Sequence, residues 1–77
     1  MSMNYNEYLE SKSAIMLGKP VIKGTRITVE LILKMLSEGA STEDILMAYP
    51  HLQAVHVSAV LAYATDVIAN ESLIQAA

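Results

Sequence analysis

The segment LGKPVIKGTRITV, residues Leu17–Val29, decides how this chain folds. It contains two of the three glycines of the chain and three of its five basic residues. Gly18 and Gly24 supply the positive φ angles that tight turns need and that residues with a β-carbon resist, while Pro20 fixes its own φ. The segment therefore predicts two turns in quick succession, placed immediately before a helix.

Short apolar runs on either side of the first turn predict a β hairpin. Ala14–Leu17 precedes the turn Gly18-Lys19-Pro20, and Val21–Ile22 follows it. Runs of this length separated by glycine and proline are typical of strand–turn–strand. Residues 1–13 are polar without a clear period, and we expect them to form an N-terminal arm.

Three helices are predicted after the hairpin, each with its own boundary residues. Thr28 is a suitable N-cap for the first helix, and Gly39 supplies the left-handed residue that ends it. Ser41 begins a short second helix with Asp44 as its capping-box partner. A third helix runs from about residue 53 to residue 70. The expected fold is mainly α: a homeodomain-like helix-turn-helix bundle over residues 14–70, followed by a C-terminal tail, 71–77.

The third helix is apolar nearly all round, which predicts that it is buried on several sides. One stripe is expected to face the core: Val57, Val60, Leu61, Ala64, Val67 and Ile68. The other faces carry a second apolar set, the candidate dimer interface: Val55, Ala59, Ala62 and Tyr63.

The composition also favours a homodimer. The chain has 77 residues, of which 53% are hydrophobic and 17% charged, and it has no cysteine. A domain of this size buries a limited share of its surface and has no disulfide to stabilise it. Sharing apolar surface with a second copy, most often about a two-fold axis, is the simplest solution.

The charges are distributed unevenly along the chain. All five basic residues lie within residues 12–34, where Glu30 is the one acidic residue, so this window carries +4. Residues 1–11 carry −2 and residues 35–77 carry −5, which gives the net charge of −3. The molecule therefore has a modest basic end, although its net charge argues against a free-standing nucleic-acid binder.

Neither a membrane span nor a secretory signal is predicted. The longest weakly charged stretch, residues 45–65, is interrupted by Pro50, His51, Gln53 and His56. A spanning helix needs about 20 predominantly apolar residues. The first residues, MSMNYNEYLESKS, lack a basic start followed by an apolar run. We expect a cytoplasmic protein.

The turn segment also carries a family resemblance. Gly18–Ile27, GKPVIKGTRI, resembles the GKPxIxGTRI signature of domain-of-unknown-function family 433, and the likeness extends over about residues 14–70. Members are small three-helix, homeodomain-like or winged-helix-like proteins, frequently dimeric, and many are described as antitoxins encoded beside a PIN-type ribonuclease toxin. The resemblance thus implies a bacterial type II toxin–antitoxin system. This chain departs from the family at Gln53, usually Thr or Ser, and at His56, usually acidic or amide.

The basic residues of the turn segment are candidates for DNA binding. Lys19, Lys23 and Arg26 on a stiff β arm suit contacts with phosphate or the minor groove. The alternative for the lysines is a solvated face. For Arg26, the planar guanidinium favours an ion pair with Glu30 or Glu38 that shapes the start of the first helix.

The third helix is the expected recognition helix if the fold reads DNA. Its start offers Gln53 and His56 as candidate contacts, but no Arg or Lys for the usual bidentate contact with guanine. We therefore expect weak operator binding, alone or together with the toxin. Two other functions remain open: a dimeric protein-interaction module, and a transcription regulator without a toxin.

Catalysis and metal binding are not predicted. Gly24 follows Gly18 by six residues and is followed by Thr25-Arg26, which does not match a phosphate-binding GxxxxGK[ST] loop. His51 and His56 are five residues apart and do not match a helical metal pair. Three short helices also leave little room for a pocket. We expect no catalytic residue, cofactor, metal ion or small-molecule ligand.

Overall fold

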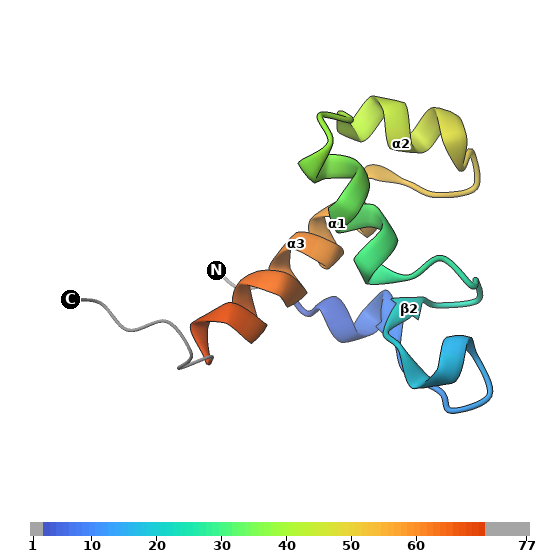
Figure 1. Cartoon of the computed structure of the whole chain (residues 1–77), viewed down its shortest axis with the longest axis vertical. Helices are drawn as coiled ribbons and strands as arrows, with labels where there is room; N and C mark the ends of the chain where they lie inside the picture. Colours follow the sequence, from blue (N-terminus) through green and yellow to red (C-terminus); the bar gives the residue numbers. More distant parts are fainter. Residues whose placement is uncertain (1–2, 71–77) are drawn as a thin grey trace.

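The computed structural model describes residues 3–70 and consists of a short hairpin followed by three helices (Figure 1). This confirms the predicted fold class. The elements, in chain order, are the 3₁₀ turn η1 (Tyr5–Glu7), strand β1 (Leu9–Glu10), the 3₁₀ turn η2 (Met16–Gly18), strand β2 (Val21–Ile22), and helices α1 (Val29–Ser37), α2 (Thr42–Ala48) and α3 (Ala54–Ala69).

The hydrophobic core lies where α1 and the first half of α3 meet the hairpin. α3 contacts both other helices and η1, so it is the element around which the rest is arranged. Aliphatic side chains dominate the core, as expected for a small domain without disulfides. Its buried members are Leu9, Val21, Ile22, Ile27, Val29, Ile32, Ile45, Leu52, Val57, Ala59 and Val60.

The position of the first strand differs from the prediction. Ala14–Leu17 does not form a strand; the pairing strand is Leu9–Glu10, from the segment that we expected to be an arm. The antiparallel register places Leu9 opposite Ile22, and both side chains are buried. Pairing through Leu9 therefore adds an apolar side chain to the core, whereas residues 14–17 are exposed apart from the half-buried Ile15.

The turn η2 holds two bulky residues in a conformation that such residues rarely adopt. Met16 has φ 49° and Leu17 has φ 58°, followed by Gly18 at φ 82°. The left-handed region brings Cβ close to the following carbonyl oxygen and costs about 1–2 kcal/mol per residue for L-amino acids. Because Leu17 is 94% exposed, packing against residues 3–70 does not offset that cost.

Relief of this strain is testable by a Leu17→Gly substitution. For the monomer, at a concentration too low for association, we expect the free energy of unfolding to rise by about 0.5–1 kcal/mol, because the strain relieved exceeds the added entropy of glycine in the unfolded chain. The matched control is Met47→Gly, since Met47 is 80% exposed but lies within α2. There glycine should lower the free energy of unfolding by about 1 kcal/mol. Urea titration followed by circular dichroism measures the free energy of unfolding of both variants. A change of the same sign in the two variants would contradict the prediction.

The ends of α1 confirm the predicted boundary residues. The Thr28 hydroxyl accepts a hydrogen bond from the Leu31 N–H at 3.0 Å and caps the start of the helix. At the other end Gly39 adopts φ 99°. The Gly39 N–H donates to the Leu36 carbonyl, and the Ala40 N–H donates to the Met35 carbonyl. These two bonds form a Schellman motif, which satisfies the last carbonyls of the helix.

The start of α2 is the predicted capping box. The Asp44 N–H donates to the Ser41 hydroxyl at 3.1 Å, and the Ser41 N–H donates to the Asp44 carboxylate at 2.9 Å. The hydrogen bonds from the Ser41 backbone and then from its hydroxyl lower the pKa of Asp44 from its usual value. Asp44 therefore remains ionised and available as an acceptor to a lower pH than an isolated aspartate.

The second half of α3 is more exposed than the sequence predicts. Val57 and Val60 are buried as expected, but Leu61, Val67 and Ile68 are exposed. Figure 1 shows the reason: the last turns of α3 extend beyond α1 and α2, where neither helix covers them. The predicted single stripe therefore divides into a buried first half and an uncovered second half.

Candidate interaction surfaces

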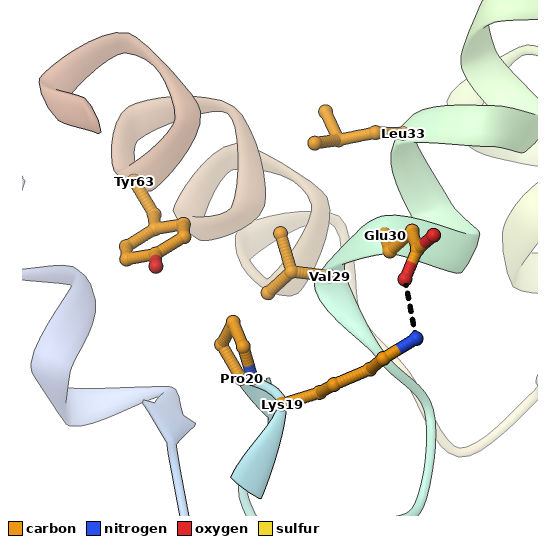
Figure 2. Close-up of a pocket in the computed structure, with 6 residues that line it drawn as sticks. All are labelled: Lys19, Pro20, Val29, Glu30, Leu33 and Tyr63. Atoms are coloured by element: carbon orange, nitrogen blue, oxygen red, sulfur yellow. Dashed lines mark hydrogen bonds and ion pairs between the residues drawn. The ribbon is translucent and has the colours of Figure 1, made fainter. Parts of the chain in front are cut away.

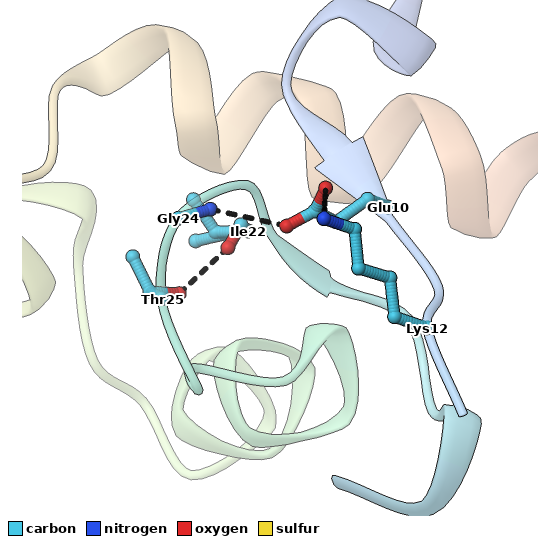
Figure 3. Close-up of polar contacts among 5 residues, drawn as sticks. All are labelled: Glu10, Lys12, Ile22, Gly24 and Thr25. Atoms are coloured by element: carbon cyan, nitrogen blue, oxygen red, sulfur yellow. Dashed lines mark hydrogen bonds and ion pairs between the residues drawn. The ribbon is translucent and has the colours of Figure 1, made fainter. Parts of the chain in front are cut away.

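A network of hydrogen bonds fixes the loop between β2 and α1. The Glu10 carboxylate accepts the Gly24 N–H at 3.2 Å and lies 3.6 Å from the Lys12 ammonium (Figure 3). The Thr25 hydroxyl donates to the Ile22 carbonyl at 2.7 Å and accepts the Ile27 N–H at 3.0 Å. Gly24 has φ 76°. The loop is thus a structural turn held from both sides, as predicted for Gly24.

Thr25 and Glu10 hold this loop in place, and neither role was predicted from the sequence. A threonine directly after a turn glycine is a signal for the first, because its hydroxyl commonly bonds to nearby backbone. Glu10 gave no comparable signal, since its role depends on the pairing of β1 with β2.

Lys19 is held in an ion pair within the chain. Its ammonium lies 3.0 Å from the Glu30 carboxylate, and both side chains are exposed. The expected pairing of Arg26 with Glu30 or Glu38 is therefore wrong: among residues 3–70, no carboxylate lies within 4.0 Å of the Arg26 guanidinium. The physical reason is position, because Lys19 lies at the base of the hollow beside α1 and reaches Glu30 across the first turn of that helix.

Lys23 and Arg26 are the exposed cations of the fixed loop. Neither forms an ion pair with a carboxylate of the described chain. Together they provide two positive charges on a rigid turn, which suits contact with an anionic surface.

His56 caps the start of α3. The Nδ1 atom of His56 accepts the Gln53 N–H at 2.9 Å, and the His56 N–H donates to the Gln53 carbonyl at 2.9 Å. His56 thus takes the acceptor role that an acidic or amide residue plays in a capping box. The Tyr8 ring packs edge-on against the imidazole at 5.8 Å between centroids. His56 is half-buried, and the proposed contact of its ring with a base would compete with these interactions.

One exposed face of α3 carries no charge, whereas Asp66 lies exposed on another. Positions spaced by three and four residues lie on one face of a helix. On α3 the exposed positions with this spacing form what we call the outer stripe: Ala54, Ser58, Leu61, Thr65 and Ile68. The Thr65 hydroxyl donates to the Leu61 carbonyl at 2.8 Å, so it is satisfied within the helix. The outer stripe has the character of a protein contact rather than of a DNA-reading face.

The candidate dimer residues on α3 lie in different environments. Val55, Ala62 and Tyr63 are half-buried, whereas Ala59 is fully buried in the core of its own chain. The Tyr5 ring meets Tyr63 edge-on at 5.4 Å between centroids, so the N-terminal segment covers part of this face. The four residues therefore do not form one free surface, and Ala59 is unavailable for contact with a second copy.

An apolar hollow of about 300 Å³ lies between the segment before β2, α1 and α3 (Figure 2). Its apolar walls come from three separate elements, with the Lys19–Glu30 ion pair at one side. The expectation that three short helices leave little room for a pocket is wrong, because this hollow lies beside two of them. The residues that line the hollow are Lys19, Pro20, Val29, Glu30, Leu33 and Tyr63. Among the apolar residues that line the hollow, only Tyr63 was predicted as a site residue. The four-residue spacing of Val29 and Leu33 places both on one face of a helix, and this is the signal that the sequence offered for them.

A second, larger hollow of about 700 Å³ lies between the N-terminal segment and the second half of α3. Tyr5 lines it and donates its hydroxyl to the Asp66 carboxylate at 2.5 Å. This hydrogen bond, followed by desolvation and the negative charge of Asp66, raises the pKa of Tyr5 from its usual value. The contact ties the N-terminal segment to the exposed part of α3.

The raised pKa predicts a loss of stability at alkaline pH. A group with a higher pKa in the folded state stabilises the fold fully below its unfolded value of about 10 and loses that contribution as pH rises through the folded value. Tyr5→Phe should therefore be less stable than the unmodified chain at pH 8, and the difference should shrink above pH 10.5. Urea titrations at both pH values measure this, with Tyr49→Phe at the end of α2 as control. A difference that is independent of pH would contradict the prediction.

Within the described part of the chain, no group of three or more His, Cys, Asp or Glu side chains is arranged to hold a metal ion. The helices between residues 3 and 70 are also too short or too polar for any of them to cross a membrane.

The comparisons with known proteins give one match. A family model described as "Protein of unknown function (DUF433)" matches residues 9–64. No curated protein and no solved structure matches the chain. The matched range begins at β1 and ends within α3, so it contains the fixed loop, the 300 Å³ hollow and most of the outer stripe.

Proposed function

Because the chain belongs to the DUF433 family of proteins of unknown function, we propose that it is a homodimeric antitoxin that binds a PIN-type ribonuclease toxin. The antitoxin context is taken from the resemblance of the GKPVIKGTRI segment. The toxin contact is assigned to the outer stripe of α3.

The uncharged outer stripe is the observation that supports this proposal most directly. It runs along α3 without a Lys, Arg, Asp or Glu, and it includes Leu61 and Ile68, which is 71% exposed. A face of this kind suits a helix laid into an apolar groove of a partner, where anchors follow i, i+3, i+4 and i+7 spacing. DNA would require cations at the same positions to neutralise phosphate.

Co-expression with any PIN-type ribonuclease encoded beside the gene tests the toxin contact. We expect a stable complex on size exclusion and loss of ribonuclease activity in it. Leu61→Glu combined with Ile68→Glu should raise the Kd of the complex by about 100-fold or more, because a carboxylate is desolvated at two contact positions. Met47→Glu, at an 80% exposed position on α2, is the matched control and should leave the Kd unchanged.

Two results would overturn the toxin proposal. Absence of a complex with any adjacent ribonuclease removes the partner. A complex that tolerates both glutamates as well as it tolerates Met47→Glu removes the outer stripe as its contact.

Operator DNA is a second candidate partner, supported by the exposed Lys23 and Arg26 on the fixed loop. In this proposal the loop contacts phosphates, and α3 does not read bases. Lys23→Ala combined with Arg26→Ala should weaken binding to the upstream DNA of the gene, and the slope of log K against log salt should fall by about two. Lys34→Ala on α1 is the control, and equal effects of the two changes would contradict the loop contact.

A further inference from the structure

Leu17 is an exposed apolar side chain, and it lies two residues before the segment that lines one side of the 300 Å³ hollow. Leu17 is a bulky apolar side chain at the tip of η2, 94% exposed and in the left-handed region. Strained backbone of this kind persists where another contact makes use of it. Nothing within residues 3–70 covers the Leu17 side chain, so such a contact has to come from outside the described residues.

The hollow suits an aliphatic side chain better than a small metabolite. Its walls are formed by Pro20, Val29, Leu33 and Tyr63 (Figure 2). Its charged groups are already paired with each other, at 3.0 Å between the Lys19 ammonium and the Glu30 carboxylate. Ligand pockets normally offer a few free polar groups that fix orientation, and their volumes begin at about 300 Å³. This hollow therefore lies at the small end of that range and is mainly apolar.

Leu17 and the hollow are also neighbours in the sequence. Leu17 precedes Lys19 and Pro20, which line the hollow, by two and three residues. A two-fold interface brings the same patch of both copies together, so it requires a patch that is complementary to itself. A projecting side chain next to a hollow that accepts it meets this requirement.

We propose that Leu17 of each copy inserts into the hollow of the second copy, forming a two-fold interface with two reciprocal contacts. This inference rests on the homodimer of the proposed function and specifies its contact surface. The charges at the edge of the hollow agree with this reciprocal contact. Lys19 and Glu30 carry opposite charges, and their side chains are 55% and 72% exposed. A two-fold axis beside Pro20 can place the Lys19 ammonium of one copy next to the Glu30 carboxylate of the other. Opposite charges then face each other across the interface, which is more favourable than an arrangement that brings like charges together.

A pair of substitutions tests the reciprocal contact. Leu17→Lys places a cation on the projecting side, and Leu33→Glu places an anion in the wall of the hollow. Analytical ultracentrifugation should give a dimer for the unmodified chain and a Kd raised by about tenfold or more for each variant, because each desolvates a charge in an apolar site. Met47→Lys changes a similarly exposed apolar residue on α2 and should dimerise like the unmodified chain.

Mixing the two variants gives the sharper result. In the mixed dimer one native contact, Leu17 against an unmodified hollow, is retained, and at the other site a lysine faces a glutamate. The mixture should therefore associate more tightly than either variant alone. An effect of the substitutions on folding does not produce this recovery. Because Leu33 is half-buried, Leu17→Asn serves as a second variant that suits the left-handed backbone, and it should also raise the dimer Kd.

Each contrary outcome overturns a defined part of the proposals. A monomeric unmodified chain at high micromolar concentration removes the homodimer and this interface, while toxin binding through the outer stripe is measured separately. A dimer that is unaffected by Leu17→Lys removes this interface alone. If that variant stays dimeric but loses affinity for operator DNA, Leu17 contacts DNA and the proposal is wrong.

Discussion

Replacing Ile32 with alanine is expected to lower the free energy of unfolding by about 3 kcal/mol. Ile32 is fully buried on α1, within the core that α1 shares with α3 and the hairpin. Removing three carbons there costs their transfer free energy and leaves a cavity that the surrounding side chains fill only partly. Since domains of this size have a free energy of unfolding of several kcal/mol, a large fraction of the stability is lost.

Ile68→Ala is the matched control for this substitution. It removes the same atoms from a helix position that is 71% exposed, and the expected change is within about 0.5 kcal/mol. Chemical denaturation followed by circular dichroism measures both variants. If the two substitutions were equally costly, the core assigned to α1 would be wrong.

Thr28→Val is expected to lower the free energy of unfolding by about 1–2 kcal/mol. The two side chains have nearly the same shape, so the change isolates the hydroxyl that accepts the Leu31 N–H. Thr28 is the one polar residue among the buried residues of the described chain, and water replaces this acceptor poorly there. N-cap losses of this kind cost about 0.5–2 kcal/mol.

Thr28→Ser separates the cap from the methyl group. Serine keeps the accepting hydroxyl, so it should retain most of the stability that valine loses. Urea titration of the three proteins gives the comparison. A serine variant as unstable as the valine variant would assign the role of Thr28 to its methyl group in the core.

The helices were predictable because their boundaries depend on local chemistry. Thr28, Gly39 and the Ser41–Asp44 pair each act within a few residues of their own position, so the sequence alone specifies them. The hairpin was predicted in kind but not in position. Which run pairs with Val21–Ile22 depends on which one can bury a side chain in the core, and this is a property of the assembled fold.

The candidate site was predicted less completely for the same reason. Gly24 was predicted correctly as a turn residue. The ion-pair partner of Glu30 was predicted incorrectly, because Lys19 and Arg26 are both near Glu30 in the sequence and only the path of the loop decides between them. The hollow was not predicted because its walls come from the segment before β2, from α1 and from α3 together. His56 illustrates a substitution that keeps a role, since its imidazole nitrogen replaces the oxygen acceptor usual at that position.

The contact between Tyr5 and Asp66 has a consequence for the order in which the molecule assembles. These residues are 61 positions apart, nearly the whole described chain. Closing so long a loop has a higher entropic cost than forming the adjacent helices, and contacts of this kind slow folding. During synthesis on the ribosome, Tyr5 emerges well before Asp66, so we expect the segment around Tyr5 to stay without this contact until α3 has been made.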